Sequence, residues 1–515
     1  MLVPARSDAA VAARTFRALR VASRPAETWL LVGIVAVGAL VRFATLGSQS
    51  YWFDEAQAAH ELHLSLGSML SFFNAVETAP PLYFVVGWVW VHLFGDGAVA
   101  LRSLSALAGT ALIPITFLCG RELVSRRAGL LAAAFVAINP FMVWYSQEAR
   151  EYILVAAFCG VSLLFFARAL RDASTRNIAW WGVFSGLALL THYFAGFLVA
   201  PEAVWLLYVA RRRATVIAVA ALVVIELALI PLLLAHATNS LLGFIGDTSL
   251  ITRIREVPVA FALGPPFESS LLSYGLIGAA VLVAILIALL IVGADSDELR
   301  GAGIAAVLAG CVLLLPILAA LLGKDYYLER AVIPAFVPLS IVVATACTTT
   351  RLRVPGAALA TVLLGGFAYG LIRIDTDAAY QRPDWRAVAH ALGTPSSRRA
   401  IVAYDGGLAT DPLMLYLPGV PWTKPSGFSQ SSSPVRIGEL DVVGYTWQAL
   451  ADPLPSGVKL IATRRVNGYR VDRFSFSPAR VLTPPVIAAL APKLLGPGPP
   501  GGAVLVQSPG SSPDA

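Results

Sequence analysis

Two adjacent carboxylates, Asp54 and Glu55, follow the first long apolar segment of the chain, within residues 51–56 (YWFDEA). An acidic pair is costly next to lipid, so its presence there is itself a reason to suspect a functional site. A carboxylate at this position can accept the proton of a hydroxyl group as a general base, or orient that group. The alternative interpretation is a solvated pair, or one that caps the following helix.

A second set of polar residues lies at similar positions, at the ends of other apolar segments. Its members are Glu77, Tyr83, Tyr145, Glu148, Arg150, His192, Lys324 and Arg330. For the charged members the alternative interpretation is structural, since each can pair with an opposite charge nearby in the chain or lie in the first turn of a helix. For His192 the alternative is an anchor at the membrane surface.

The composition is that of a multi-pass membrane protein. Of the 515 residues, 57% are hydrophobic and 13% are charged, whereas a soluble protein has about 25% charged residues. The net charge of +7 comes from cations in short loops between apolar segments, so membrane topology explains it better than nucleic-acid binding. The four cysteines lie inside apolar segments without metal-ligand spacing, so we predict neither a zinc site nor disulfide bonds.

The positive-inside rule sets the predicted topology. We predict that the Arg-rich residues 1–27 are cytoplasmic and contain no cleavable signal. About eleven crossings follow, the first over 29–47 and the last over 354–372. This count requires the short apolar segment 82–93 to lie on the membrane surface, within one outer loop over 48–97. All candidate residues then face the outer side of the cytoplasmic (inner) membrane. Lys324 and Arg330 are cations on a side where cations are rare, which favours an anionic ligand.

The predicted domain organisation has four parts. After the cytoplasmic tail comes an all-α transmembrane domain over residues 28–375. From 376 to 475, polar residues alternate with short apolar strands, which predicts a small α/β domain on the outer side. Residues 476–515 are rich in Pro, Gly and Ser, and we predict that they are disordered after a short helix.

Several of these motifs, in this order and on one side of the membrane, resemble a known family. They are WFDEA (52–56), PPLY (80–83), YSQEAR (145–150), Arg330 with Pro334, and PDWR (383–386). Together they resemble the GT-C membrane glycosyltransferases, and within these the bacterial branch related to protein O-mannosyltransferases and the lipid A aminoarabinose transferase. The chain departs from many relatives at Ala79, where they have His, and at Ala331, where they have Tyr.

The resemblance implies an inverting glycosyltransferase. Its donor would be a polyprenyl-phosphate sugar used at the outer face, and its acceptor a lipid, a glycan or a protein. The expected roles are catalysis by Asp54 and Glu55, acceptor positioning by Glu148 and Glu77, donor-phosphate binding by Lys324, Arg330 and Arg150, and substrate contact by His192, Tyr145 and Tyr83. Asp54 and Glu148 are oxygen ligands, which would favour Mg²⁺, Mn²⁺ or Ca²⁺ if a divalent cation takes part.

Two other classes of function remain open. A lipid-linked sugar transporter or flippase would have ionisable groups at mid-depth and paired halves with broken helices. Glu202 and Glu226 are the few acids within or near crossings, and we see no internal repeat. A non-catalytic envelope assembly protein of the same fold is the second alternative, and Asp54 is the residue whose replacement separates it from an enzyme.

Overall fold

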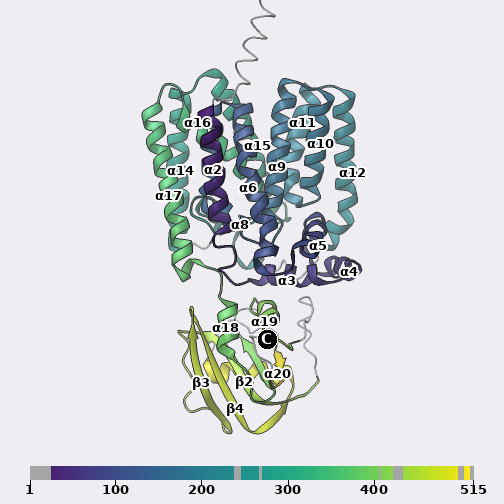
Figure 1. Cartoon of the computed structure of the whole chain (residues 1–515), viewed down its shortest axis with the longest axis vertical. Coiled ribbons are helices and arrows are strands. Elements are labelled where there is room, and N and C mark those ends of the chain that lie inside the picture. Colours follow the sequence, from purple (N-terminus) through teal and green to yellow (C-terminus); the bar gives the residue numbers. More distant parts are fainter. Residues whose placement is uncertain are drawn as a thin grey trace, which may run out of the picture.

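A computed structural model describes residues 25–236, 245–265, 269–404, 408–420, 433–496 and 504–510. The chain forms a bundle of long helices and a smaller domain of strands and helices that lies against one end of it (Figure 1). The termini of the bundle helices therefore matter most for function, because the polar candidate residues lie in the loops between them.

All segments predicted as crossings are helical. They are α2 (Pro25–Phe43), α6 (Ala98–Leu123), α7 (Arg126–Ile138) with α8 (Pro140–Ser146), α9 (Tyr152–Arg171), α10 (Thr175–Leu189), α11 (Gly196–Val209), α12 (Arg213–His236), α14 (Ser269–Gly293), α15 (Ser296–Leu321), α16 (Phe336–Thr348) and α17 (Arg353–Thr376). Among the described residues, seven helices are long and apolar enough to cross a membrane, or up to eight if α7 and α8 form one span. The count of about eleven stays a prediction, because α10, α11 and α16 are shorter than that criterion.

The break between α7 and α8 directs the chain toward the candidate site. The two helices meet at an angle of 59°. Asn139 ends α7 and caps α8, its side chain accepting a hydrogen bond of 3.1 Å from the amide of Met142, and Pro140 occupies the first turn of α8. The side-chain amide of Asn139 also donates to the carbonyl of Phe261 in α13 (Leu250–Leu263) at 2.8 Å. The loop after α8, which contains Glu148 and Arg150, is thereby held within the protein.

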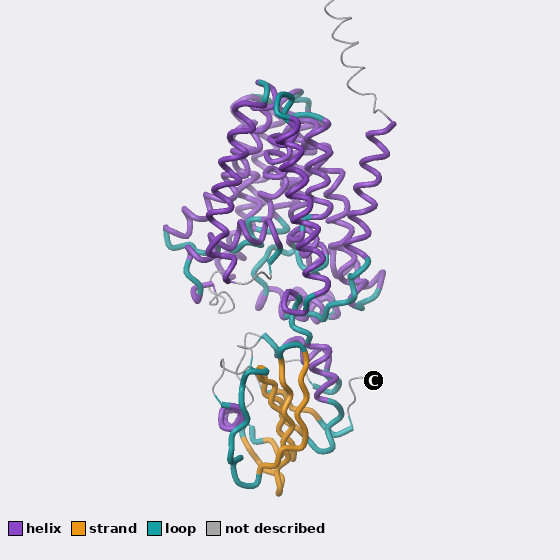
Figure 2. The backbone as a smooth tube through the Cα atoms, turned by 90° about the vertical axis from the view of Figure 1, so that its left-hand side faces the viewer, coloured by secondary structure: helices purple, strands orange, loops and turns teal. Residues whose placement is uncertain are grey.

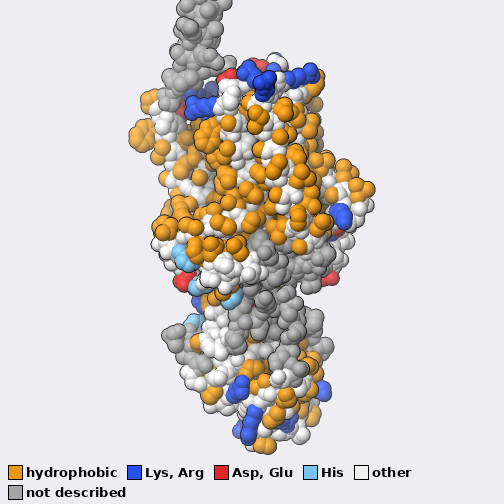
Figure 3. Space-filling view, turned by 90° about the vertical axis from the view of Figure 1, so that its right-hand side faces the viewer, with side chains coloured by type: hydrophobic (Ala, Val, Ile, Leu, Met, Phe, Trp, Pro, Cys, Tyr) orange, Lys and Arg blue, Asp and Glu red, His pale blue; other side chains and the backbone are white. Residues whose placement is uncertain are grey.

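The surface of the bundle separates apolar and basic side chains. Figure 3 shows apolar side chains over the face of the helices, while Lys and Arg gather at the end remote from the small domain. This distribution is the one expected of a membrane protein whose Arg-rich loops face the cytoplasm.

The segment between α2 and α6 contains three short helices, α3 (Phe53–His63), α4 (Leu66–Val76) and α5 (Leu82–Phe94). They lie at the end of the bundle that faces the small domain (Figure 1). Tyr51, Leu62, Tyr83 and Phe84 pack together in one buried apolar cluster and join α3 to α5. This arrangement agrees with one continuous loop over 48–97, on the same side as the other candidate residues.

The small domain is built on a five-stranded sheet with the order β3-β4-β2-β1-β5. Its strands are β1 (Arg399–Ala403), β2 (Val435–Tyr445), β3 (Val458–Val466), β4 (Tyr469–Leu482) and β5 (Leu505–Gln507), and only β1 and β2 pair in parallel. Helices α18 (Trp385–Leu392) and α19 (Thr410–Tyr416) cover one face, toward the bundle, and α20 (Pro484–Leu495) covers the other. Figure 2 shows the sheet in side view, connected to the bundle through the chain that enters α18.

Among the described residues after 475, the structure has the predicted short helix but also strands where disorder was predicted. β4 continues to Leu482, α20 follows, and β5 pairs antiparallel with β1, with Leu505 opposite Ile401. Apolar side chains such as Ile487 and Leu494 of α20 are buried against the sheet, and this burial outweighs the Pro- and Gly-rich composition. Residues 497–503 and 511–515, like the Arg-rich residues 1–24, lie outside the described part of the chain.

Candidate active site

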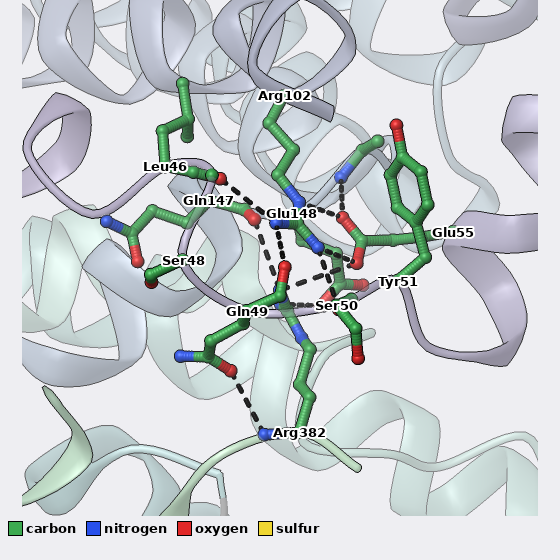
Figure 4. A network of polar contacts seen from close by, with 12 residues as sticks. Leu46, Ser48, Gln49, Ser50, Tyr51, Glu55, Arg102, Gln147, Glu148 and Arg382 are labelled. Carbon is green, nitrogen blue, oxygen red and sulfur yellow. Dashed lines mark hydrogen bonds and ion pairs between the residues drawn. The ribbon is translucent and has the colours of Figure 1, made fainter. Parts of the chain in front are cut away.

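Glu55 is the centre of a buried ionic network (Figure 4). Arg102 of α6 donates two hydrogen bonds of 2.7 Å to its carboxylate, the amide of Ala149 donates a third of 2.9 Å, and a guanidinium nitrogen of Arg382 lies at 3.5 Å. Burial by itself would raise the pKa of Glu55, but the charges of Arg102 and Arg382 and these hydrogen bonds hold it below its ordinary value. Glu55 is therefore ionised and fully engaged in structural contacts. The catalytic role expected from the sequence stays a prediction.

Arg102 also fixes the chain that enters α3. Its guanidinium donates to the carbonyls of Leu46, Gln49 and Ser50 at 3.0, 2.9 and 3.1 Å. All these acceptors come from the turn just before Asp54 and Glu55. A guanidinium has five donors, so one buried arginine can fix both this turn and the Glu55 carboxylate.

Arg382 joins the network from a segment more than 200 residues away in the sequence. It lies between α17 and α18, donates to Glu148 at 2.8 Å and to the carbonyl of Gln147 at 3.2 Å, and stacks 4.4 Å from the ring centroid of Trp144. Its own amide donates to the side chain of Gln49 at 3.0 Å. The connection to the small domain thus contributes a cation to the membrane-domain site.

Glu148 has one bound and one unbound carboxylate oxygen. Oε2 accepts from Arg382, whereas Oε1 is buried with no hydrogen-bond partner among the described residues. Burial raises the pKa of Glu148 to about 8, and the charges of Glu55 and Asp54 add to this effect while Arg382 opposes it. At neutral pH the group is mostly protonated and can donate a hydrogen bond.

Asp54 has the opposite environment to its neighbour Glu55. It is half-buried in the first turn of α3, and within the described part of the chain its carboxylate accepts no hydrogen bond and forms no ion pair. Its charge nevertheless acts on Glu148, Arg330 and Asp411. Of the two adjacent acids, Asp54 is the one with an open carboxylate.

Arg330 is the residue of this cluster that is best suited to bind a phosphate group. Its guanidinium carbon lies 5.8 Å from the ring centroids of both Trp52 and Tyr152. Tyr152 and Asp54 raise the pKa of Arg330 against the opposing effect of burial, which keeps it charged. The loop before it is fixed by Arg253, which binds Asp325 at 2.5 and 2.8 Å.

The aromatic residues predicted to contact substrate adjoin this cation. Tyr152 lies 5.2 Å from Tyr145 and 6.0 Å from His192, measured between ring centroids. Burial, together with the charges of Arg150 and Arg330, lowers the pKa of His192 to about 4, so the imidazole is neutral. Its Nδ1 accepts from the amide of Phe194 at 3.1 Å, which places the proton on Nε2.

Arg150 and Glu77 bind each other. Two hydrogen bonds of 2.9 Å join them, and Glu151 lies 3.1 Å from Arg150 on its other side. The predicted role of Arg150 in phosphate binding therefore competes with two buried carboxylates. Tyr83 is also buried, its hydroxyl having no hydrogen-bond partner among the described residues.

Lys324 lies apart from the other predicted residues. It is exposed after the end of α15, and within the described ranges no hydrogen bond or ion pair joins its ammonium to the cluster. The structure thus brings together Asp54, Glu55, Glu148, Arg330, Tyr145 and His192 and leaves Lys324 outside.

Four buried polar residues were missed by sequence reasoning: Arg102, Arg382, Glu61 and Asp411. Arg102 gave a usable signal, because an arginine inside an apolar segment needs a partner. Glu61 lies near Glu77, and burial followed by the charge of Glu77 raises its pKa well above the ordinary value. Arg382 precedes the PDWR motif, but nothing local pointed to its partners.

Metal binding stays a prediction. Across the described residues, no three His, Cys, Asp or Glu side chains are grouped as a metal site. The oxygens that fit a hard divalent cation are those of Asp54 and Oε1 of Glu148.

Comparison with known proteins supports the resemblance stated above. A family profile described as dolichyl-phosphate-mannose-protein mannosyltransferase matches residues 78–235. The crystal structure of ArnT from Cupriavidus metallidurans in the apo state matches with a TM-score of 0.55 and 16% identity, over 87% of this chain and 98% of that one. The same protein bound to undecaprenyl phosphate matches with a TM-score of 0.52, at the same identity and coverage. A search of curated proteins found no match.

These findings confirm the predicted relationship to the GT-C glycosyltransferases. The chain has the fold of ArnT, with a mostly helical part and a small C-terminal sheet domain.

Proposed function

We propose that the chain transfers a sugar from a polyprenyl-phosphate donor to a hydroxyl group of an envelope acceptor, a lipid, glycan or protein, with inversion at the anomeric carbon. The observation behind the proposal is the open carboxylate of Asp54 in the same cluster as the cation of Arg330. The family profile and the ArnT structure with bound undecaprenyl phosphate support a lipid-linked donor.

The reaction needs one base and one cation. Asp54 accepts the proton of the acceptor hydroxyl as its oxygen bonds to the anomeric carbon. The bond from that carbon to the phosphate oxygen breaks at the same time, which gives inversion. Arg330 stabilises the negative charge that develops on the departing lipid phosphate.

The remaining residues position the reactants. Glu55, bound by Arg102, holds α3 so that Asp54 keeps its place. The protonated Glu148 and the neutral His192 offer hydrogen bonds to sugar hydroxyls. If a divalent cation binds, we predict that Asp54 and Glu148 provide its oxygen ligands.

The proposed location is the cytoplasmic (inner) membrane, with the N-terminus inside and the small domain outside. The gathering of Lys and Arg at the end of the bundle remote from that domain supports this orientation (Figure 3). The reaction then takes place at the outer surface, where the apolar face of the bundle can accommodate the prenyl chain.

Incubation with a panel of polyprenyl-phosphate sugars and an envelope extract as the source of acceptor tests the proposal, with released polyprenyl phosphate as a readout that does not require the acceptor to be identified. We expect release from at least one donor, an adduct of one sugar on an envelope component by mass spectrometry, and loss of both in Asp54→Asn. Asp452→Asn, an exposed aspartate of the small domain, is the matched control. Donor that crosses the bilayer of proteoliposomes without being consumed would instead identify a flippase.

A further inference from the structure

Asp411 is a buried carboxylate that the proposed reaction does not use. It lies in the first turn of α19 in the small domain and is 2% exposed. Its Oδ2 is buried without a hydrogen-bond partner, and within the described ranges neither of its oxygens forms a hydrogen bond or an ion pair. Buried polar atoms are nearly always paired, so an unpaired carboxylate at this position indicates a partner from outside the chain.

The helix of Asp411 packs on the helix of Asp54. The hydroxyl of Tyr416 in α19 accepts a hydrogen bond of 2.8 Å from the amide of Tyr51, and the two rings stack with centroids 6.2 Å apart. Leu415 of α19 packs into the same apolar cluster as Ala58 of α3. α19 therefore lies against α3 at the junction of the two domains (Figure 1).

Helical spacing places both carboxylates beside that contact. Asp411 precedes Leu415 by four residues, and Asp54 precedes Ala58 by four, so each acid lies one turn from a packed residue on the same side of its helix. Burial disfavours the ionised form of Asp411, and the negative charge of Asp54 adds to this effect. Together they raise the pKa of Asp411 to about 8. The two open acids thus belong to one electrostatic environment made by both domains.

A ligand at this junction must satisfy carboxylate oxygens. Hydrogen-bond donors or a positive charge do so, whereas a negatively charged group would be repelled by the charge of Asp54 and would offer no donor to Asp411. A ring with several hydroxyl groups can donate to Asp411 while another of its hydroxyls faces Asp54.

We infer that Asp411 of the small domain binds the acceptor, and that this acceptor is a hydroxyl-rich compound without negative charge. The inference rests on the transfer reaction proposed above and adds to it a substrate class and a role for the small domain. The acceptor site is then incomplete without that domain, since one of its two open carboxylates comes from each side of the junction.

Binding without donor tests this inference. The probes are methyl β-D-glucopyranoside, its 2-amino-2-deoxy analogue and methyl β-D-glucuronide, measured by saturation-transfer NMR on the full chain in nanodiscs. We expect the neutral and amino glycosides to bind and the glucuronide to bind at least tenfold more weakly. Asp411→Ala should weaken both binders at least tenfold, and Asp411→Asn should abolish the preference for the amino glycoside over the glucuronide.

Asp452→Asn, on the surface of the same domain, should bind all three probes as the wild-type chain does. Unchanged binding in both Asp411 variants, equal binding of the glucuronide, or no binding of any probe to the wild-type chain overturns the inference. Asp411→Asn keeps the size of the side chain, so it remains informative even if Asp411→Ala fails to fold.

Turnover separates this inference from the proposed function. A wild-type chain that binds the glycosides through Asp411 but releases no polyprenyl phosphate from any donor contradicts the proposed reaction and not the binding site. A chain that consumes donor, with acceptor-probe binding independent of Asp411, overturns the binding site alone.

Discussion

Asp54 and Glu55 are neighbours in the sequence and opposites in the structure. Glu55 is fully buried, and two arginines and one backbone amide surround its carboxylate. Asp54 is half-buried with an open carboxylate, and its charge acts on Arg330 and on Asp411 of the small domain. One turn of helix thus presents an acid to the protein interior and an acid to the candidate site.

The difference shows how a membrane protein can fix a reactive group. A catalytic carboxylate has to keep an open oxygen, so other contacts have to hold it in place. Glu55, Arg102 and the turn over 46–50 provide those contacts for α3. The buried side gives rigidity and the open side gives chemistry, so a change of Asp54 should leave the stability of the protein unaffected.

Arg102→Ala should have the largest effect on the buried side. Removal of one partner of a buried ion pair costs about 3–5 kcal/mol, because the other charge is left uncompensated. We expect a marked fall in the melting temperature of the purified protein in detergent. Arg373→Ala is the matched control, since Arg373 forms a partly exposed pair with Asp377. Equal melting temperatures for the two variants would contradict the role of the Glu55 network.

Arg330→Gln should have the next largest effect, and it should affect the open side. Loss of a charge-assisted contact to phosphate should raise the KM for donor about 10- to 100-fold, or about 1.4–2.7 kcal/mol, with little change in melting temperature. Arg330→Lys should recover part of the loss. Kinetics of polyprenyl phosphate release measure this. Lys324→Gln is the comparison and should leave the KM for donor unchanged. An equal rise in its KM would show that Lys324 also binds the donor and would contradict its placement outside the cluster.

Arg382→Gln removes the cation shared by the two sides and should show a pH-dependent loss of stability. Burial already raises the pKa of Glu148 to about 8, so in the wild-type chain Glu148 makes stability fall as pH rises from about 4.5 to 8. Without Arg382 the pKa rises further and the fall continues above pH 8. Melting temperatures of the two proteins, measured from pH 5 to 9, should therefore differ by a constant amount up to about pH 8 and diverge above it. A second change, Glu148→Gln, should remove most of the divergence, and a constant difference at all pH values would contradict this origin.

Asp411→Asn should give the smallest effect, with the opposite sign. Asp411 has a pKa raised to about 8 in the folded chain, against 3.8 as its ordinary value. Its carboxyl therefore lowers stability progressively as pH rises from about 4 to 8, and the neutral amide does not. The melting temperature of Asp411→Asn relative to wild type should increase over this range, by thermal scans in detergent. A decrease would mean that the ionised carboxylate has a stabilising partner.

Much of the fold could be predicted from the sequence, because the lengths of apolar segments and the positions of Arg-rich loops depend directly on the membrane. The same charge pattern required segment 82–93 to stay at one end of the bundle, where α5 does lie, and so predicted that Asp54, Glu148 and Arg330 share a side. The prediction for the tail included the short helix that is α20, but it missed the end of β4 and the strand β5. These short strands are defined by their pairing with β2 and β1, which the local composition does not show.

The missed part of the site consists of contacts between distant segments. Arg382 meets Gln147 and Glu148 across more than 200 residues, and α19, the helix of Asp411, meets α3 across more than 300. Spacing rules describe neighbours on one helix or strand, so they cannot locate such partners. They also cannot separate Asp54 from Glu55, because that distinction depends on Arg102, which approaches from another helix.

Paired measurement of Asp54→Asn and Glu55→Gln tests the central claim most directly. Each variant changes one carboxylate to an amide of the same size, and donor turnover and melting temperature are measured on both proteins. We predict that Asp54→Asn lowers polyprenyl phosphate release about 10²- to 10⁴-fold at an unchanged melting temperature, and that Glu55→Gln lowers the melting temperature strongly. Full turnover in Asp54→Asn, or an unchanged melting temperature in Glu55→Gln, would contradict the assignment of chemistry to one acid and anchoring to the other.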